Sequence, residues 1–262
     1  MKAIDEFRAR PGLRLRDKDA RADRKGNADA LDRMLAEISD LQEMLYAERQ
    51  RKLLIVLQGT DTAGKDGTVR TLFSRVSPMG LRATGFKAPT EIEAAHDFLW
   101  RIHREVPKAG EIAVFNRSHY EDVLITRVLG MITPAECKRR YAQIRDFERM
   151  LAESGTTILK LFLHISKDEQ RERLQARVDD PHKHWKFDPE DLKHRELWKD
   201  YQKAYADAIT ETDTGHAPWY VVPADSKSYR NEIVARLLLE TLKGMRLDWP
   251  PPDKRLLKLK VL

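Results

Sequence analysis

The sequence has little of several features that mark particular classes of protein. Its 262 residues include a single cysteine, Cys137, so an internal disulfide and a cysteine-rich metal site are both excluded. The opening residues, MKAIDEFRARPG, have no apolar core of a signal peptide, and no run of about 18 apolar residues occurs anywhere. We therefore expect a soluble, cytoplasmic protein that does not span a membrane.

The charge of the chain is weighted toward the positive. Lys and Arg number 48 against 42 Asp and Glu, which gives a formal net charge of +6. Such a balance suits a polyanionic partner, which on composition alone could be RNA, an anionic membrane or a phosphate polymer. Hydrophobic residues make up 41% of the chain, enough for a substantial globular core.

Apolar runs alternate with helical patterns along most of the chain. Four runs without polar alternation are typical of buried parallel strands: residues 53–57, 111–115, 156–165 and 219–222. Periodic apolar residues and end signals predict these helices: residues 28–52, 66–76, 91–106, 134–155, 168–178, 192–209 and 229–244. The alternation predicts a three-layer α/β fold, with a parallel sheet flanked by helices.

The strongest motif is LLIVLQGTDTAGKDGT, in which an apolar strand runs into a turn punctuated by glycine. Gly59, Gly64 and Lys65 match the phosphate-binding pattern G-x-x-x-x-G-K, and a helix-compatible segment follows. Glycines let backbone amides turn toward phosphate, the helix N-terminus adds a positive dipole end, and the lysine reaches the bridging phosphates. We assign phosphate binding to this loop and to Gly67 and Thr68 after it; an ordinary strand-to-helix turn is the alternative.

Two acids stand in this loop, where negative charge is unexpected. Asp66 occupies the position at which Ser or Thr normally offers a neutral oxygen to magnesium, and Asp61 lies inside the turn. Carboxylates here would repel bare phosphate but would hold a hard divalent cation more strongly, so both are candidate Mg²⁺ ligands. The alternative of capping the following helix carries equal weight for Asp66, and it also stays open for Asp61.

A second polar motif, IAVFNRSHYEDVL, follows the next predicted strand. Such strands usually end in an acid that organises a metal, but here that position holds Asn116. The negative ligands of a metal would then come from the remaining acids: Asp61, Asp66, Glu121 and Asp122. Arg117 could stabilise charge on a transferring phosphoryl group. Ser118 and Glu121 also match a capping box, which is the structural alternative for Glu121.

Residues 177–195 form a polar stretch between two predicted helices, rich in basic side chains and interrupted by proline. Arg177, Lys183 and Lys186 are its candidate contacts to a polyanion, and the stretch could close as a lid over the phosphate site. Three histidines lie in it without the spacing of a zinc motif, which argues against zinc. Composition alone favours a solvated loop as the alternative.

Together these segments resemble the polyphosphate kinase type 2 family. The resemblance is carried in order by GTDTAGKDGT, FKAPTEIEAAHDFLWRIH, FNRSHYEDVL, RVDDPHKHWKFDPEDLKHRELWKDYQKAY and APWYVVPADSK, across most of residues 53–227. It implies a phosphate-loop kinase fold with a helical lid, dependence on Mg²⁺, and phosphoryl transfer between inorganic polyphosphate and nucleotides. The form FNRSHYED is similar to the third subgroup, which acts on AMP and ADP, although many members have Asp in place of Asn116.

The resemblance also implies roles for single residues. Those that match the family's loop, second motif and lid are Asp61, Lys65, Asp66, Arg117, Glu121, Asp122, Arg177 and Lys183. We take four of these as catalytic: Asp61, Lys65, Arg117 and Glu121. Further candidates for binding phosphate or nucleotide are Lys87, Arg101, Asn116 and Arg127. Lys87, Arg101 and Arg127 would supply the donor channel if residues 177–195 were only a solvated loop.

We therefore predict a Mg²⁺-assisted, reversible, in-line transfer of the terminal phosphoryl group of polyphosphate to AMP and ADP, forming ADP and ATP. Neither nucleic acid nor a membrane is an expected partner. Two alternatives stay open. One is an ATP-dependent nucleoside monophosphate kinase with the same fold and loop. The other is a basic phosphate-loop protein that binds nucleic acid without turnover, although no nucleic-acid recognition module is apparent.

The predicted organisation has three parts. Residues 1–50 form an N-terminal arm and helix packed on the domain, residues 51–245 form the phosphate-loop kinase domain, and residues 246–262 form a tail. The tail ends KRLLKLKVL, which could be a subunit contact, a packed strand or a frayed end. The expected assembly is a homo-oligomer.

Overall fold

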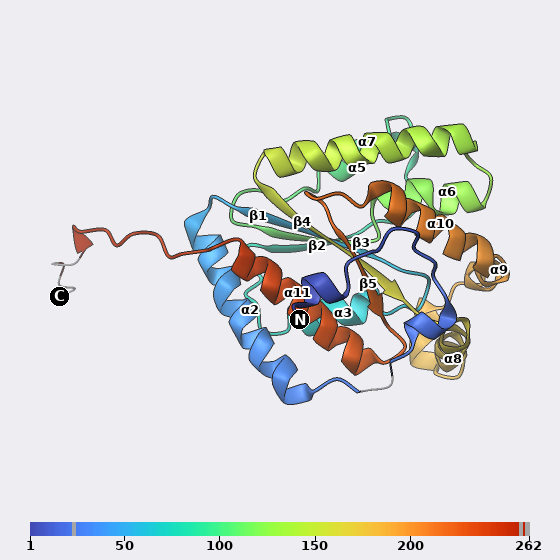
Figure 1. Ribbon diagram of the computed structural model, residues 1–262, viewed down its shortest axis with the longest axis horizontal. Helices are drawn as coiled ribbons and strands as arrows, with labels where there is room; N and C mark the ends of the chain where they lie inside the picture. The colour runs from blue at the N-terminus through green and yellow to red at the C-terminus, as the bar shows by residue number, and fades with distance from the viewer. Residues whose placement is uncertain (23–24, 257–258, 260–262) are drawn as a thin grey trace.

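The computed structural model describes residues 1–22, 25–256 and 259. Its centre is a five-stranded parallel sheet in the order β2-β3-β1-β4-β5 (Figure 1). The strands are β1 (Lys52–Gln58), β2 (Leu81–Gly85), β3 (Ile112–Asn116), β4 (Thr156–His164) and β5 (Trp219–Pro223). The predicted α/β class is confirmed, and β1, which leads into the phosphate loop, lies in the middle of the sheet.

Helices cover both faces of the sheet (Figure 1). The α-helices are α1 (Ala3–Glu6), α2 (Ala28–Glu48), α3 (Lys65–Leu72), α4 (Glu91–Ala94), α5 (Trp100–His103), α6 (Ile125–Val128), α7 (Pro134–Glu153), α8 (Lys167–Val178), α9 (Glu190–Glu196), α10 (Trp198–Thr212) and α11 (Lys227–Gly244). Short 3₁₀ helices are η1 (Asp17–Ala20), η2 (His119–Val123) and η3 (Pro181–Lys186). Helices α8 and α9 lie beyond the carboxyl end of the sheet, at the right of the view (Figure 1).

Alternate residues of β1 enter two separate hydrophobic cores. Leu53, Ile55 and Leu57 pack with α2 and α11 on one face of the sheet. Leu54 and Val56 pack with α7 and α10 on the other face. A strand buried on both faces needs apolar side chains at every position, which is why its sequence shows no alternation.

The secondary structure differs from the predicted one at three places. Strand β2 was not predicted, because it lies at the sheet edge and its residues, LRATG, leave their side chains partly exposed. The predicted helix over 91–106 is broken into α4 and α5, so Ile92 is 69% exposed while Ile102 is fully buried. Thr90 forms a capping box that starts α4, and the Asp97 carboxylate accepts from the Leu99 amide in the turn before α5. The predicted helix over 192–209 is likewise divided, into α9 and α10.

The N-terminal segment packs along the outer edge of the sheet. The Phe7 carbonyl accepts from the Val221 amide, and the Ala9 amide donates to the Trp219 carbonyl, each at 2.9 Å.

At the C-terminal end, the chain leaves α11 and extends away from the body (Figure 1), with most of residues 248–256 exposed. Most of the remaining tail lies outside the described residues, and with it the proposed tail contact. None of the helices in the described segments is long and apolar enough to cross a bilayer.

A buried ionic network supports the segment after β3. The Lys160 ammonium contacts Glu148 Oε2 at 2.6 Å, and the Tyr120 hydroxyl donates to Glu148 Oε1 at 2.8 Å. All three side chains are fully buried, and Thr212 completes their hydrogen bonding. Because pairing offsets the cost of burying a charge, this network fixes Tyr120 and hence η2, which begins two residues after Arg117.

His164, at the end of β4, makes the stability of the fold depend on pH. Its imidazole is buried, with Nε2 2.9 Å from the Arg16 carbonyl. Burial lowers the pKa of His164 below the ordinary 6.5, against the opposing effects of Arg16, Asp17 and Asp225. The unfolded chain therefore binds the proton more readily, and stability falls as the pH drops below about 6.5. We expect His164→Asn to flatten the decline of Tm from about pH 7 to about pH 5 in thermal unfolding; parallel profiles would contradict this.

Candidate active site

The phosphate loop occupies residues 59–64, between β1 and α3. A Cβ on Gly59 would stand 2.7 Å from the Leu163 carbonyl oxygen, and one on Gly64 would stand 2.0 Å from a guanidinium nitrogen of Arg230. Gly64 also has a φ of 98°, in the left-handed region that favours glycine. A side chain at either position would clash with these neighbouring atoms, so both positions require glycine in addition to any role in binding phosphate.

The Lys65 ammonium folds back over the loop. It donates to the carbonyls of Gly59 at 2.6 Å and Thr60 at 3.3 Å. Burial, together with the charge of Arg117, lowers the pKa of Lys65 to about 8. The charges that oppose this shift are those of three acids: Asp61, Glu121 and Asp66. Lys65 therefore lies among three of the four predicted metal ligands.

Asp61 is the most connected acid of the site. Its Oδ1 accepts from Arg117 Nη2 at 2.7 Å, and its Oδ2 lies 3.5 Å from His194 Nδ1. Burial alone would raise the pKa of Asp61, but the hydrogen bond from His194 and the charges of Arg117 and Lys65 outweigh it, so the pKa lies well below its usual range. Asp61 is therefore a carboxylate at any neutral pH.

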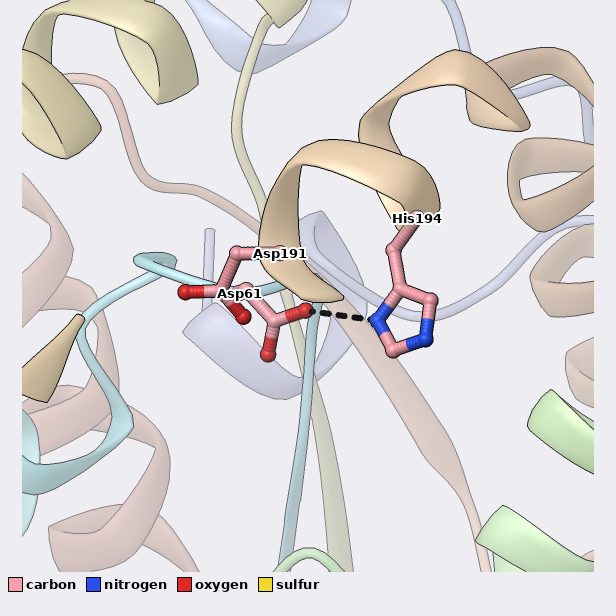
Figure 2. A group of neighbouring side chains, drawn as sticks. All are labelled: Asp61, Asp191 and His194. Atoms are coloured by element: carbon pink, nitrogen blue, oxygen red, sulfur yellow. Dashed lines mark ion pairs between the residues drawn. The ribbon is translucent and has the colours of Figure 1, made fainter. Parts of the chain in front are cut away.

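Helix α9, in the segment predicted to form a lid, brings a further acid to the same place. Asp191 and His194 lie within 4.8 Å of Asp61, measured between single ligand atoms, and Figure 2 shows the three side chains together. Burial and the charge of Asp61 raise the pKa of Asp191 to about 6, against the charge of Arg177. The sequence placed His194 among loosely spaced histidines, and only the fold reveals that it faces the phosphate loop.

Arg117 and Glu121 approach the loop from the end of β3. Arg117 has a φ of 63°, a strained conformation for a residue other than glycine, and it contacts Asp61. The predicted capping box of Ser118 and Glu121 does not form, because the Ser118 hydroxyl accepts from the Tyr120 amide instead. Burial raises the pKa of Glu121, with Arg117 opposing. Glu121 is thus a site acid rather than a helix cap.

Gln58, the last residue of β1, orients Glu121. Its side-chain amide satisfies both neighbours when the NH₂ donates to Glu121 Oε1 at 3.0 Å and the carbonyl accepts from the Ser118 hydroxyl, also at 3.0 Å. Gln58 is fully buried, so its position is fixed by the sheet. Nothing in the sequence pattern distinguished Gln58 from the other residues of the strand.

The two remaining acids lie in different surroundings. Asp66 is exposed at the start of α3, where its Oδ1 accepts from Asn116 Nδ2 at 2.6 Å. Asp122 lies between two guanidinium groups, 3.8 Å from Arg101 and 3.9 Å from Arg140. Burial raises the pKa of Asp122, with the charges of Arg101, Arg140 and His119 opposing. Asp122 is therefore paired with arginines, whereas the other three predicted metal ligands surround Lys65.

Two hollows meet beside the loop. The loop hollow is lined by Gly59, Thr60, Asp61, Gln170, His194, Trp198, Tyr201 and Tyr205. The large hollow, of about 870 Å³, has apolar walls that include Phe86, Phe98, Leu99 and Ile132, with Lys87, Arg101, Arg139 and Arg140 among its cations. Arg117, Glu121 and Ile125 line both hollows. A group bound in one hollow would thus face a group bound in the other across Arg117 and Glu121.

Three of the predicted phosphate-binding residues lie elsewhere or have other contacts. Arg127 lines neither hollow, because it donates to Asp207 at 2.6 Å and to the Tyr141 hydroxyl at 3.0 Å. Thr68 is fully buried and donates to the Gly64 carbonyl at 3.1 Å. Gly67 faces Arg230, with a Cβ position 3.7 Å from its guanidinium.

A comparison with known protein families agrees with this arrangement. The family model for polyphosphate kinase 2 matches residues 21–249. The chain belongs to the polyphosphate kinase 2 family. The match covers the phosphate loop, the motif after β3 and α9, and so includes both hollows.

Individual members of the polyphosphate kinase 2 family are similar to this chain over most of their length. The AMP/ADP-polyphosphate phosphotransferase of Meiothermus ruber is 54% identical over 225 residues, covering 86% of this chain and 84% of the relative. The ADP-polyphosphate phosphotransferase of Rhodopseudomonas palustris is 44% identical, covering 81% and 78%. The crystal structure of polyphosphate kinase 2 from Arthrobacter aurescens TC1 has a TM-score of 0.91 at 46% identity, and the alignment covers 97% and 93% of the two chains.

The basic residues predicted for the lid of this polyphosphate kinase 2 family member have distinct surroundings. Arg177 donates to the Lys186 carbonyl at 2.8 Å and contacts Asp191 at 3.4 Å, so it joins α8 to η3 and α9. Lys183 is half-exposed and pairs with Asp180 at 2.8 Å, while the Lys186 ammonium lies 4.7 Å from the centre of the Trp185 ring. None of these three basic residues lines either hollow, contrary to their predicted contact with a polyanion at the phosphate site.

Proposed function

We propose that this chain transfers the terminal phosphoryl group of inorganic polyphosphate to AMP and to ADP, reversibly and in line. The observation that carries the proposal is the sharing of Arg117 and Glu121 by two hollows, one over a phosphate loop and one with apolar walls. The names of the similar proteins support it, since that of Meiothermus ruber acts on both AMP and ADP.

The large hollow is the proposed site of the acceptor nucleotide. Its volume of about 870 Å³ lies within the range of small-molecule sites, and its apolar walls suit a base. Arg101 is buried and lies in the wall, where it donates to the Lys87 carbonyl. The phosphate of a nucleotide held there would point toward Arg117 and Glu121, which close the hollow on the side of the phosphate loop.

The reaction requires little covalent chemistry from the protein. A terminal oxygen of the nucleotide phosphate attacks the end phosphorus of the polymer, and the bond to the next bridging oxygen breaks on the opposite side. Catalysis of such transfers comes mostly from positioning and from cations placed around the equatorial oxygens. Lys65 and Arg117 are the cations that we assign to this role, and their contacts with the loop carbonyls and Asp61 hold them in place before substrate binds.

The acids around Lys65 fit a magnesium ion. Asp61, Asp66 and Glu121 offer hard carboxylate oxygens, and the negative charges of all three raise the pKa of Lys65, which indicates that they lie near its ammonium. When bound, Mg²⁺ would neutralise part of the negative charge of the phosphate chain. Asp61 is the principal candidate ligand, because its low pKa keeps it ionised and because Arg117 and His194 orient its two oxygens.

The donor is proposed to be a polyanion held under the lid. Lys183 is half-exposed and pairs with Asp180, so its ammonium is accessible to a polyanion. Lys183→Ala should therefore raise the apparent KM for polyphosphate about fivefold, which is the effect expected from losing one partly exposed charge contact. The KM for AMP should change much less. Arg177→Ala should act in the same direction, and the double variant should show a shallower dependence of activity on salt.

Kinetics at several salt concentrations test the lid prediction. Lys138→Ala is a matched control, because Lys138 is exposed on α7 and lines neither hollow. If the variants at 177 and 183 keep the wild-type KM and salt dependence, the segment is a solvated loop and the donor lies elsewhere.

One experiment separates the proposed donor from its alternatives. Purified protein with Mg²⁺ and AMP is incubated with polyphosphate alone or with ATP alone, and ADP is measured by chromatography. We expect ADP, and then ATP, with polyphosphate. Product with ATP alone would identify an ATP-dependent monophosphate kinase, and binding of nucleic acid without product from either donor would support the non-enzymatic alternative.

The proposal extends to a cytoplasmic homo-oligomer. A cytoplasmic location is supported by the free, buried thiol of Cys137 and by the use of nucleotide substrates. Exposed apolar side chains such as Ile92 and Met131, each 69% exposed, could supply subunit contacts. Sedimentation at several protein concentrations measures the assembly state, and a monomer at all of them would contradict the homo-oligomer.

A further inference from the structure

Arg230 is a buried cation directly behind the phosphate loop. It lies in the first turns of α11, is 3% exposed, and donates to the Ala63 carbonyl at 3.2 Å. Its other nitrogens contact the amide oxygen of Asn231. Within residues 1–22, 25–256 and 259, no carboxylate lies within ion-pairing distance of this guanidinium.

The guanidinium packs against the turn at which the loop becomes α3. A Cβ on Gly64 would lie 2.0 Å from Arg230 Nη1, and one on Gly67 would lie 3.7 Å from Nη2. These positions flank Lys65 and Asp66 in the chain. The positive charge of Arg230 therefore lies on the side of the loop away from the hollows, adjacent to the N-terminus of the helix.

Hydrogen bonding to the loop does not by itself account for this arginine. The Ala63 carbonyl also accepts from Arg173 at 3.2 Å, and Arg173 bonds in addition to the carbonyls of Thr62 and Ala224. Arg173 has a carboxylate partner, Glu169, at 2.6 Å. Arg230, by contrast, duplicates one hydrogen bond to the loop and bonds otherwise to the neighbouring Asn231, while its charge has no carboxylate partner among the described residues.

An unpaired buried charge is unfavourable in the free protein. Burial, and repulsion from Arg173, lower the pKa of Arg230 to about 10, so it stays protonated at neutral pH. A polar neutral side chain could make the same hydrogen bond without this cost. Charge of this kind is expected where an anion will later offset it, because preorganised charge close to a binding site needs no reorganisation when the anion arrives.

We propose that Arg230 is an electrostatic positioning residue, whose fixed positive charge behind the loop strengthens binding of a phosphate chain without touching it. This rests on the proposed function, because it takes polyphosphate as the anion bound at the loop. Arg230 would add to the dipole of α3 and to the charge of Lys65. It would also partly offset the repulsion between the phosphate chain and the carboxylates of Asp61 in the loop and Asp66 in the first turn of α3.

The test compares variants that remove the charge with variants that keep it. Arg230→Met removes the charge at similar volume, and Arg230→Lys keeps the charge but loses the planar donor group. Arg236→Met on the same helix is the matched control, since Arg236 is at the surface near Glu6. Binding of tripolyphosphate is measured by calorimetry at low salt, and Tm is measured without ligand.

Arg230→Met should raise the Kd for tripolyphosphate about tenfold, which equals about 1.4 kcal/mol, while the Tm of the free protein stays equal or rises. Arg230→Lys should stay within about threefold of wild type. Should the methionine variant fail to fold, Arg230→Gln, which keeps a donor for Ala63, is judged by the same Kd.

Two results would overturn the role of Arg230. One is an uncharged variant that binds tripolyphosphate as wild type does, with or without a lower Tm. The other is a lysine variant that binds as weakly as the methionine variant, since the charge would then be irrelevant. Failure of the wild-type protein itself to bind tripolyphosphate would instead count against the proposed function.

Discussion

Lys65→Ala is expected to lower kcat for phosphoryl transfer by about 100- to 1,000-fold, which corresponds to about 2.7–4 kcal/mol of barrier. The ammonium is preorganised over the loop by the Gly59 and Thr60 carbonyls, so it contributes where charge develops during transfer. Such a contact acts in a partly water-excluded site and cannot be replaced by a mobile counterion. The measurement is the rate of ADP formation at saturating polyphosphate, AMP and Mg²⁺.

The fold should survive this substitution. Burial lowers the pKa of Lys65 to about 8, so removing the ammonium removes a charge that the interior disfavours. Thermal unfolding should give a Tm close to that of wild type. Lys108→Ala is the control, because Lys108 is exposed on the loop before β3. Activity of the Lys65 variant within about threefold of wild type would contradict its proposed role.

Asp61→Asn is expected to have the second largest effect, on the Mg²⁺ requirement. The amide cannot match the charge of the carboxylate, so half-maximal activity should need about 10–100-fold more Mg²⁺, a loss at least as large as is typical of altered metal surroundings. The variant also weakens the ion pair with Arg117 and the contact with His194, so kcat should fall as well. Activity is titrated with Mg²⁺ at fixed polyphosphate and AMP.

Asp66→Asn and Glu121→Gln should shift the same titration by less, because Asp66 is exposed and Glu121 has its pKa raised by burial. Asp146→Asn is the control, since Asp146 is an exposed acid on α7 that pairs with Arg149. A variant that lowers Tm but leaves the Mg²⁺ titration unchanged would identify its residue as structural rather than as a metal ligand.

The positions of Glu121 and Asp122 could not be predicted from the sequence pattern alone. Glu121 and Asp122 are neighbours in the chain and were predicted to share a metal. On the 3₁₀ helix η2 their side chains diverge. The charge of Glu121 raises the pKa of Lys65, whereas Asp122 lies between Arg101 and Arg140. Adjacent residues on a helix point in different directions, so sequence adjacency does not imply a shared site.

Sequence pattern also could not find the residues that complete the site from other elements. Gln58 lies on β1, while His194, Asp191 and Arg230 lie on α9 and α11, and all four meet the loop or its neighbours. None belongs to a local motif with a known spacing. Their roles depend on which helices pack at the carboxyl end of the sheet.

What the sequence by itself determined was local. Apolar runs without alternation identified four strands, because a strand buried on both faces must be apolar throughout. The glycine and lysine pattern identified the phosphate loop, because its backbone geometry restricts the residues that fit. The order of motifs along the chain carried the family resemblance, which the match over residues 21–249 confirms.

What only the tertiary structure decided was long-range and depended on packing. Strand β2 is held in the sheet by hydrogen bonds to β3 rather than by burial of apolar side chains, so its sequence, LRATG, carried no strand signal. Helical periodicity over residues 91–106 did not reveal the break between α4 and α5, where the Asp97 carboxylate accepts from the Leu99 amide in the intervening turn. The contact between Asp61 and His194 exists because α9 folds back over the loop, as Figure 2 shows. The spacing of residues along the chain cannot predict such a contact, because its geometry is set by the packing of elements that are distant in sequence.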